Sequence, residues 1–202
     1  MFINLPWSQW YLMLFIVFTA VAGDYLVSRS RLQMIKAFFD NITHAIIGAL
    51  SWYTVCSQYK NRSSTSTLCE VLMCTFASSV VDIDHFLAAG SLSLSAATNL
   101  ENRPIFHCST IPIVSTIVGL CISKYFNLPV FEKAVFIFFT ALATHHTRDA
   151  NRRGYWVPPF GSTKPLPYTL YIIITLAIPY FVSGLMKFSN VQKQYKYTTI
   201  IV

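Results

Sequence analysis

The sequence predicts an all-α protein that crosses a membrane with about six helices. Only 11% of its 202 residues are charged, whereas a soluble globular domain usually carries about 25%. The mean hydropathy is +0.50, and 54% of the residues are hydrophobic. Long apolar stretches alternate with short charged or proline-rich segments, which is typical of a multi-pass membrane protein. The lipid bilayer is therefore its first expected partner.

Each predicted span has the length of about 17 to 25 mostly apolar residues that a membrane-crossing helix needs. The first stretch, WSQWYLMLFIVF and onward, contains small residues as a signal peptide would. However, no Lys or Arg precedes it, so we expect a retained helix. The segment WVPPFGSTKPLPYT has too many prolines to be a span. We expect one transmembrane domain over residues 1–202, with spans at 7–27, 38–57, 68–88, 105–126, 130–147 and 168–187.

The basic character of the chain does not indicate a nucleic-acid partner. The net charge is +7, but the basic residues lie in the gaps between apolar stretches and do not form one predicted surface. The 15 Lys and Arg residues divide almost evenly between the two predicted sides, so they assign neither face to the cytosol. The five cysteines form no CxxC pair and lie mostly within spans, which argues against a disulfide framework.

Histidine and acidic residues, in contrast, gather on one predicted side of the membrane. Consecutive spans run in opposite directions, so the start of the second, the end of the third, the start of the fourth and the end of the fifth meet at one face. All five histidines belong to that face. Of the eight acidic residues, only Glu70 and Glu132 belong to the other face. Ionisable groups in membrane helices are costly and tend to mark function. The acidic residues on the histidine side are Asp24, Asp40, Asp82, Asp84, Glu101 and Asp149.

Three His/Asp pairs in this group have the spacing of neighbours on one helix face. Three helices can then direct imidazole and carboxylate groups into one pocket at the membrane surface. Such ligands suit zinc, manganese or iron, and the absence of thiolates disfavours a structural cysteine–zinc site. We therefore predict a divalent metal site that could activate water. The pairs are Asp40/His44 and His145/Asp149 at i,i+4, and Asp82/His85 at i,i+3.

Short motifs at these positions resemble, in their order, those of the YdjM-like membrane-bound metal-dependent hydrolase family. They are THAIIG, DIDHF, RPIFHCST, HHTRD and WVPPFG, and the similarity covers about residues 30–178. Pro104 and Cys108 stand where the bacterial pattern usually has Gly and Ser, and His146 has no counterpart. That family is thought to be related to zinc-dependent phospholipase C and P1 nuclease, so the resemblance implies a zinc-dependent hydrolase of phosphoesters, with a phosphate-containing lipid as one substrate class.

The resemblance also implies roles for individual residues. Asp82 would be a catalytic carboxylate, and Arg103, whose planar guanidinium can hold a phosphate in two hydrogen bonds, would be a substrate-binding residue. The alternative is a non-catalytic multi-pass membrane protein in which the His/Asp cluster is structural or binds metal without turnover. The metal ligands in the first interpretation would be His44, Asp84, His85, His107, His145 and Asp149.

Overall fold

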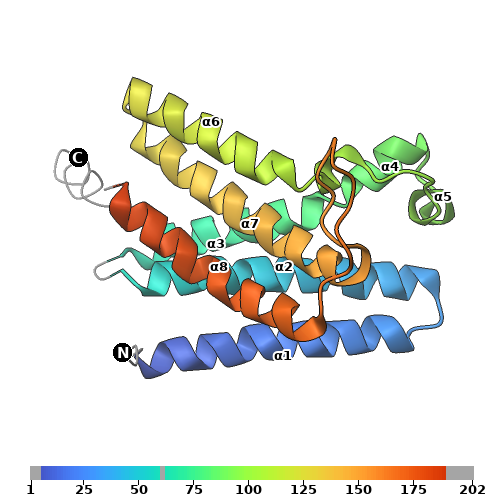
Figure 1. The fold of residues 1–202 in the computed structure, drawn as a ribbon. Helices are drawn as coiled ribbons and strands as arrows, with labels where there is room; N and C mark the ends of the chain where they lie inside the picture. The colour runs from blue at the N-terminus through green and yellow to red at the C-terminus, as the bar shows by residue number, and fades with distance from the viewer. Residues whose placement is uncertain (1–5, 60–61, 190–202) are drawn as a thin grey trace.

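A computed structural model describes residues 6–59 and 62–189, which form a bundle of helices (Figure 1). Residues 1–5, 60–61 and 190–202 of the predicted domain lie outside this description. The described residues contain no strand beyond isolated bridges around Trp156, so the predicted all-α class is confirmed. The elements are α1 (Trp7–Arg29), α2 (Gln33–Ser57), α3 (Ser64–Val80), α4 (Ile83–Ala89), α5 (Leu94–Thr98), the 3-10 helix η1 (Ile105–His107), α6 (Thr110–Phe126), α7 (Pro129–Arg153) and α8 (Tyr168–Phe188).

All six predicted spans correspond to helices, with shifted boundaries. The third span is divided, because α3 ends at Val80 and α4 begins at Ile83. The fourth begins only at Thr110, since residues 105–107 form the separate turn η1. Three helices of the described chain are long and apolar enough to cross a membrane, namely α1, the stretch Ser64–Ala89 and α8, and α6 is a shorter apolar helix.

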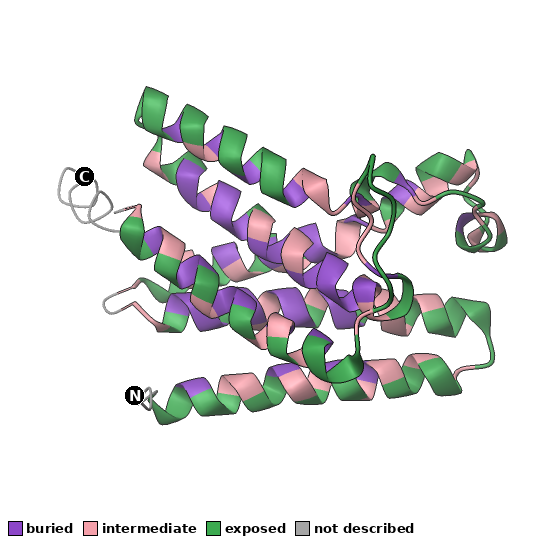
Figure 2. Cartoon of the chain, viewed as in Figure 1, coloured by how far each residue is buried: buried purple, intermediate pink, exposed green. Residues whose placement is uncertain are grey.

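Helices α2 and α7 occupy the middle of the bundle. Helix α2 packs against α1, α3, α7 and α8, and α7 packs against α2, α3, α6 and α8. Figure 2 shows long buried stretches on both, while α1 and α6 expose most of their outer faces. The central helices can therefore carry polar side chains on faces that meet other helices and not lipid, as α7 does with Thr140 and Thr144.

A close approach of α2 and α3 brings the polar ends of the central helices together. A Cβ atom at Gly48 would lie 2.0 Å from Oγ of Ser78, so only glycine allows this separation. Small residues at helix contacts permit such packing in membrane bundles. The approach places the end of α3, with the carbonyl of Ser78, against α7.

A charged cluster surrounds the buried carboxylate of Glu70, at the end of the bundle opposite to the histidines. Arg62 and Lys133 form ion pairs with this carboxylate. Trp52 Nε1 donates a hydrogen bond to it at 3.2 Å, and Ser66 Oγ donates another at 3.1 Å. This Glu70 cluster joins α2, α3 and α7 at the end far from the histidines.

Candidate metal centre

The structure brings five of the six predicted metal ligands, together with Asp82, into one cluster at an end of the bundle. Three overlapping triads have one ligand atom from each member within 4.8 Å of the others. The rings of His44 and His145 stack with centroids 3.8 Å apart. The convergence expected from the alternating spans is thus present. The triads are His44–Asp82–His145, Asp82–His85–His107 and His107–His145–Asp149.

The ligand atoms come from four separate parts of the chain. Helix α2 supplies His44, and the break between α3 and α4 with the first turn of α4 supplies Asp82 and His85. The turn η1 supplies His107. Helix α7 supplies His145 and Asp149, whose Nε2 and Oδ2 atoms lie 3.4 Å apart, as the i,i+4 spacing predicts.

The imidazole of His145 is held in one orientation from behind. Its Nδ1 lies 2.9 Å from the carbonyl oxygen of Ser78. A carbonyl only accepts hydrogen bonds, so the neutral ring carries its proton on Nδ1 and directs the Nε2 lone pair into the cluster. There Nε2 lies 3.5 Å from Asp82 and 3.4 Å from Asp149. Metal-binding histidines in proteins usually have such a backbone or carboxylate partner on the second nitrogen.

His107 is oriented in the same way by the buried carboxylate of Asp84. Its Nδ1 lies 3.3 Å from Asp84 Oδ2, and its Nε2 faces Asp149 at 3.2 Å and Asp82 at 3.4 Å. The same Asp84 oxygen accepts the backbone N–H of Phe106 at 2.8 Å. Asp84, predicted as a ligand, belongs to none of the three triads and lies behind the rings of His107 and His85. It is therefore placed to orient ligands.

Several buried atoms of the cluster lack a hydrogen bond within the described chain. They are both ring nitrogens of His44, and Oδ1 of Asp84 and Nδ1 of His85, which face each other at 3.2 Å without hydrogen-bond alignment. His44 Nε2 lies 3.4 Å from Asp149 Oδ1, but the contact lacks hydrogen-bond alignment. Buried polar atoms without partners are costly. A cation at the centre of the triads would satisfy the lone pair of a His44 nitrogen, so the residues present fit a divalent transition metal.

The electrostatics of His107 indicate the same demand for positive charge. Burial lowers the pKa of this imidazole, but Asp149, Asp82 and Asp84 outweigh burial and raise the pKa to about 11. The carboxylates therefore favour a positive charge at this point. A metal cation meets that demand as a proton does, and the two compete for the same nitrogen.

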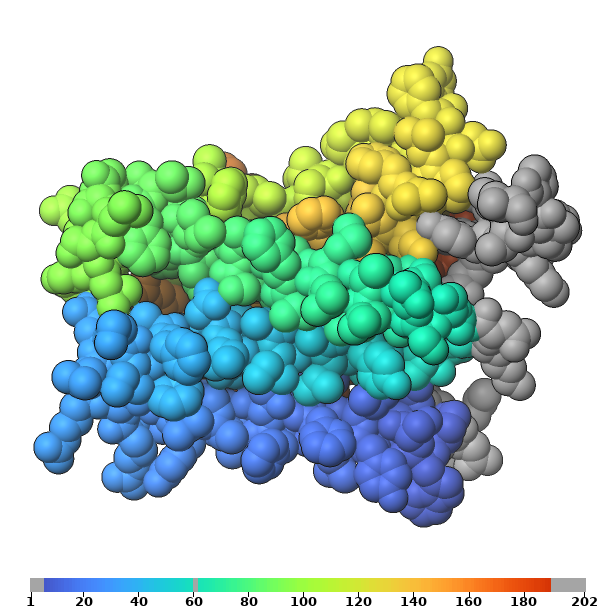
Figure 3. Space-filling model, turned by 180° about the vertical axis from the view of Figure 1, so that it is seen from behind, coloured from blue at the N-terminus to red at the C-terminus, as the bar shows by residue number. Residues whose placement is uncertain are grey.

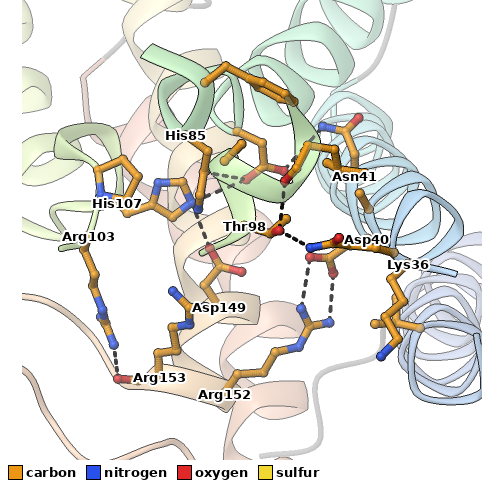
Figure 4. Close-up of a pocket in the computed structure, with 18 of the residues that line it drawn as sticks. Lys36, Asp40, Asn41, His85, Thr98, Arg103, His107, Asp149, Arg152 and Arg153 are labelled. Carbon is orange, nitrogen blue, oxygen red and sulfur yellow. Dashed lines mark hydrogen bonds and ion pairs between the residues drawn. The ribbon is translucent and has the colours of Figure 1, made fainter. Parts of the chain in front are cut away.

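Arg103 and His146 contact backbone atoms near the cluster. Arg103 lines the cavity beside it and donates hydrogen bonds to the carbonyls of Arg153 and Gly154 at the end of α7, the former drawn in Figure 4. The predicted guanidinium fork is thus partly used by the protein itself. Nε2 of His146 donates to the carbonyl of Phe106 at 2.8 Å. Because Asp84 accepts the N–H of Phe106, the two peptide groups that flank Phe106 are both fixed, and the turn with His107 is positioned.

The Asp40/His44 pair does not act as its spacing suggests. The Asp40 carboxylate pairs with Arg148 and with Arg152, the latter at 2.8 Å. Arg148 is only 1% exposed and also binds Asp24 of α1 at 2.9 Å. We did not predict Arg148 as a site residue, although its position beside Asp149 was a signal. The ion network joins α1, α2 and α7, and its members Asp40 and Arg152 line the same cavity as Asp149.

The fold and the cluster define a class: an all-helical membrane protein with a His/Asp cluster at one end of its bundle. The chain belongs to the transmembrane protein 267 family. It is 40% identical to transmembrane protein 267 of Xenopus laevis over 153 residues, covering 75% of this chain and 69% of that relative. It is 42% identical to the Danio rerio relative over 164 residues, covering 75% of this chain and 67% of that relative. It is 41% identical to the Mus musculus relative over 153 residues, covering 75% of this chain and 69% of that relative.

The other two comparisons find no relatives. No family model matches the chain, and no solved structure matches it. The resemblance to YdjM-like hydrolases therefore gains no support from them, whereas the membrane character is supported both by the relatives and by the apolar helices. The chain is a membrane protein.

Proposed function

We propose that this protein is a membrane-embedded, metal-dependent hydrolase of phosphoesters. The observation that carries the proposal is the set of three overlapping His/Asp triads in one half-buried cluster. His44, His85, His107, His145 and Asp149 would hold the metal, with Asp82 shared between two triads. Zinc is the ion that the sequence resemblance implies. When bound, such an ion lowers the pKa of a coordinated water to about 7 and stabilises charge on a phosphoryl oxygen.

The residues around the triads support this function by holding ligands and by handling charge. Ser78 and Asp84 fix the rings of His145 and His107. Hydrolysis joins a water oxygen to phosphorus and breaks the bond to the leaving oxygen, which takes up a proton. Asp82, whose side chain is 28% exposed, is the carboxylate that we propose accepts the proton of the attacking water. Asp82→Asn removes the carboxylate but keeps a side-chain oxygen that can still face the metal, so it should lower turnover more strongly than metal content.

The experiment combines metal analysis with turnover on protein purified in detergent. We expect stoichiometric zinc, manganese or iron and metal-dependent release of p-nitrophenol from p-nitrophenyl phosphate or its diester. Asp149→Ala should lose both, because Asp149 faces His107 and His145. His146→Gln is the matched control, since glutamine can still donate to the carbonyl of Phe106. Arg103→Ala should keep the metal and weaken phosphate binding.

The outcomes separate the proposed hydrolase from the non-catalytic alternative. Bound metal without turnover of any phosphoester would leave a metal-binding membrane protein. Wild-type protein without transition metal, behaving like Asp149→Ala, would leave a structural cluster. Either result overturns the proposed hydrolase.

A further inference from the structure

The candidate metal centre forms only one wall of a much larger cavity. This cavity has a volume of about 730 Å³ and lies between the end of α1, the first half of α2, the α4–α5 segment and the end of α7. Figure 3 shows a hollow on this face between α2 and the α4–α5 segment. Pockets that bind organic ligands usually measure about 300–1,000 Å³. The cavity can thus hold a ligand with far more than a phosphate group.

The walls away from the triads are of two chemical kinds. One part is apolar, and the other part is basic. Among the basic side chains Arg103 and Arg152 already have partners, whereas Arg31, Lys36 and Arg153 have no carboxylate partner among the described residues. Figure 4 shows Lys36 and Arg153 at the cavity with Asp149 and His107. The apolar lining consists of Val27, Ala37, Phe86, Leu94, Ala97 and Pro104.

The segments that form this end of the molecule also expose large apolar side chains. Leu92, in the turn between α4 and α5, is 92% exposed. Exposed apolar area in water costs roughly 25 cal/mol per Å² relative to an apolar environment, so large exposed apolar side chains of a membrane protein indicate contact with lipid. The segments that line the cavity therefore carry both exposed apolar side chains and basic groups. The exposed residues on these segments are Leu32, Met34, Leu87, Leu92 and Ile105.

We propose that this cavity binds the head group of an anionic phospholipid taken from the surrounding membrane leaflet. The phosphate would lie between the triads and the unpaired cations Lys36 and Arg153, and the glycerol and upper acyl chains would contact the apolar wall. The proposal deepens the proposed hydrolase and rests on it in one respect, namely that the phosphate faces the triads. Binding itself does not depend on turnover.

The test is equilibrium binding of radiolabelled phosphatidate to metal-loaded protein in a neutral detergent, with unlabelled competitors. Phosphatidate should compete at least tenfold better than phosphatidylcholine, whose head group carries no net charge, or glycerol 3-phosphate, which has no acyl chains. Lys36→Gln with Arg153→Gln should weaken binding about tenfold or more, since a hydrogen bond to a charged group is worth about 1.5–3 kcal/mol. Arg29→Gln is the matched control, because Arg29 stacks on Tyr25 at the same end and does not line the cavity.

Several results would overturn the lipid proposal. Equal competition by phosphatidylcholine would show that charge is not recognised, and equal competition by glycerol 3-phosphate would indicate a soluble phosphoester. Unchanged binding by the double variant would remove the basic subsite. Turnover measured on the same samples separates the two proposals. Phosphatidate binding without phosphate release defeats the hydrolase and keeps the lipid site, whereas release from soluble esters without lipid preference does the reverse.

Discussion

Two charged clusters lie at opposite ends of the bundle, and they differ in how many partners each charge has. Around Glu70, one carboxylate receives bonds from Arg62, Lys133 and Trp52, and no Glu70 atom is among the buried atoms without a hydrogen bond in the described chain. The histidine cluster holds several such atoms. Members of both clusters are buried or half-buried, so burial alone does not separate them. Unsatisfied, convergent lone pairs are what distinguish a candidate binding site from a structural ion cluster.

Removing a ligand should have the largest effect on metal binding. His145→Ala should lose bound metal beyond the roughly 10–100-fold expected of an outer residue, because Nε2 of His145 belongs to two triads. The metal-to-protein ratio after mild chelation is the measurement, with His146→Ala beside it. We expect His146→Ala to retain more metal, since its ring contacts the carbonyl of Phe106. Equal retention by His145→Ala and the wild type would contradict the comparison.

The Glu70 cluster should respond in the opposite way, through stability. Glu70→Ala leaves the Lys133 ammonium inside the bundle without its carboxylate, and breaking a buried pair in this manner costs about 3–5 kcal/mol. Denaturant unfolding in detergent measures the loss. The metal content of the folded fraction should stay at the wild-type value, and Glu70→Gln serves if the alanine variant does not fold. A Glu70 variant that has the wild-type unfolding curve but lacks metal would show that the two clusters are coupled.

A smaller effect is expected from the residue that orients His107. Asp84→Asn removes the negative charge behind the ring while its side-chain oxygen can still accept the N–H of Phe106. Changes of this kind lower metal affinity by about 10–100-fold. Titration against a competing chelator measures the affinity. If the variant bound metal as tightly as the wild type, Asp84 would have no orienting role.

The last effect concerns pH in chelated protein. The pKa of His107 is raised to about 11 from an ordinary value of about 6.5. Its contribution to stability is therefore fully present below about pH 6.5 and is lost as pH rises toward 11. The Tm of chelated protein should fall between about pH 7 and 9.5, and His107→Gln should flatten this slope. Metal affinity should rise over the same range, because fewer protons compete. A flat Tm profile in the wild type would contradict the raised pKa of His107.

The sequence predicts the helices and much of the cluster, for different physical reasons. Long apolar stretches indicate the spans, and the i,i+4 spacing correctly places His145 beside Asp149. The roles of Asp40 and Asp84 could not be predicted, because each depends on a partner distant in sequence. Asp40 turns to Arg148 and Arg152, and Asp84 turns to η1. The basic wall was also missed, since Arg31, Lys36 and Arg153 look like ordinary charged residues between spans.

The turn that carries His107 has a consequence for how the protein is made. The N–H of Phe106 is held by Asp84 and its carbonyl by His146, which lie 22 and 40 positions away in the chain. His44 and Asp82 leave the ribosome long before Asp149, so the nascent chain has only part of its ligand set during most of its synthesis. Closing these loops precedes any native arrangement of the triads. Any metal loading of the proposed centre would therefore be a late event in biogenesis, and an ion held by all the triads would mark a molecule that has finished folding in its membrane.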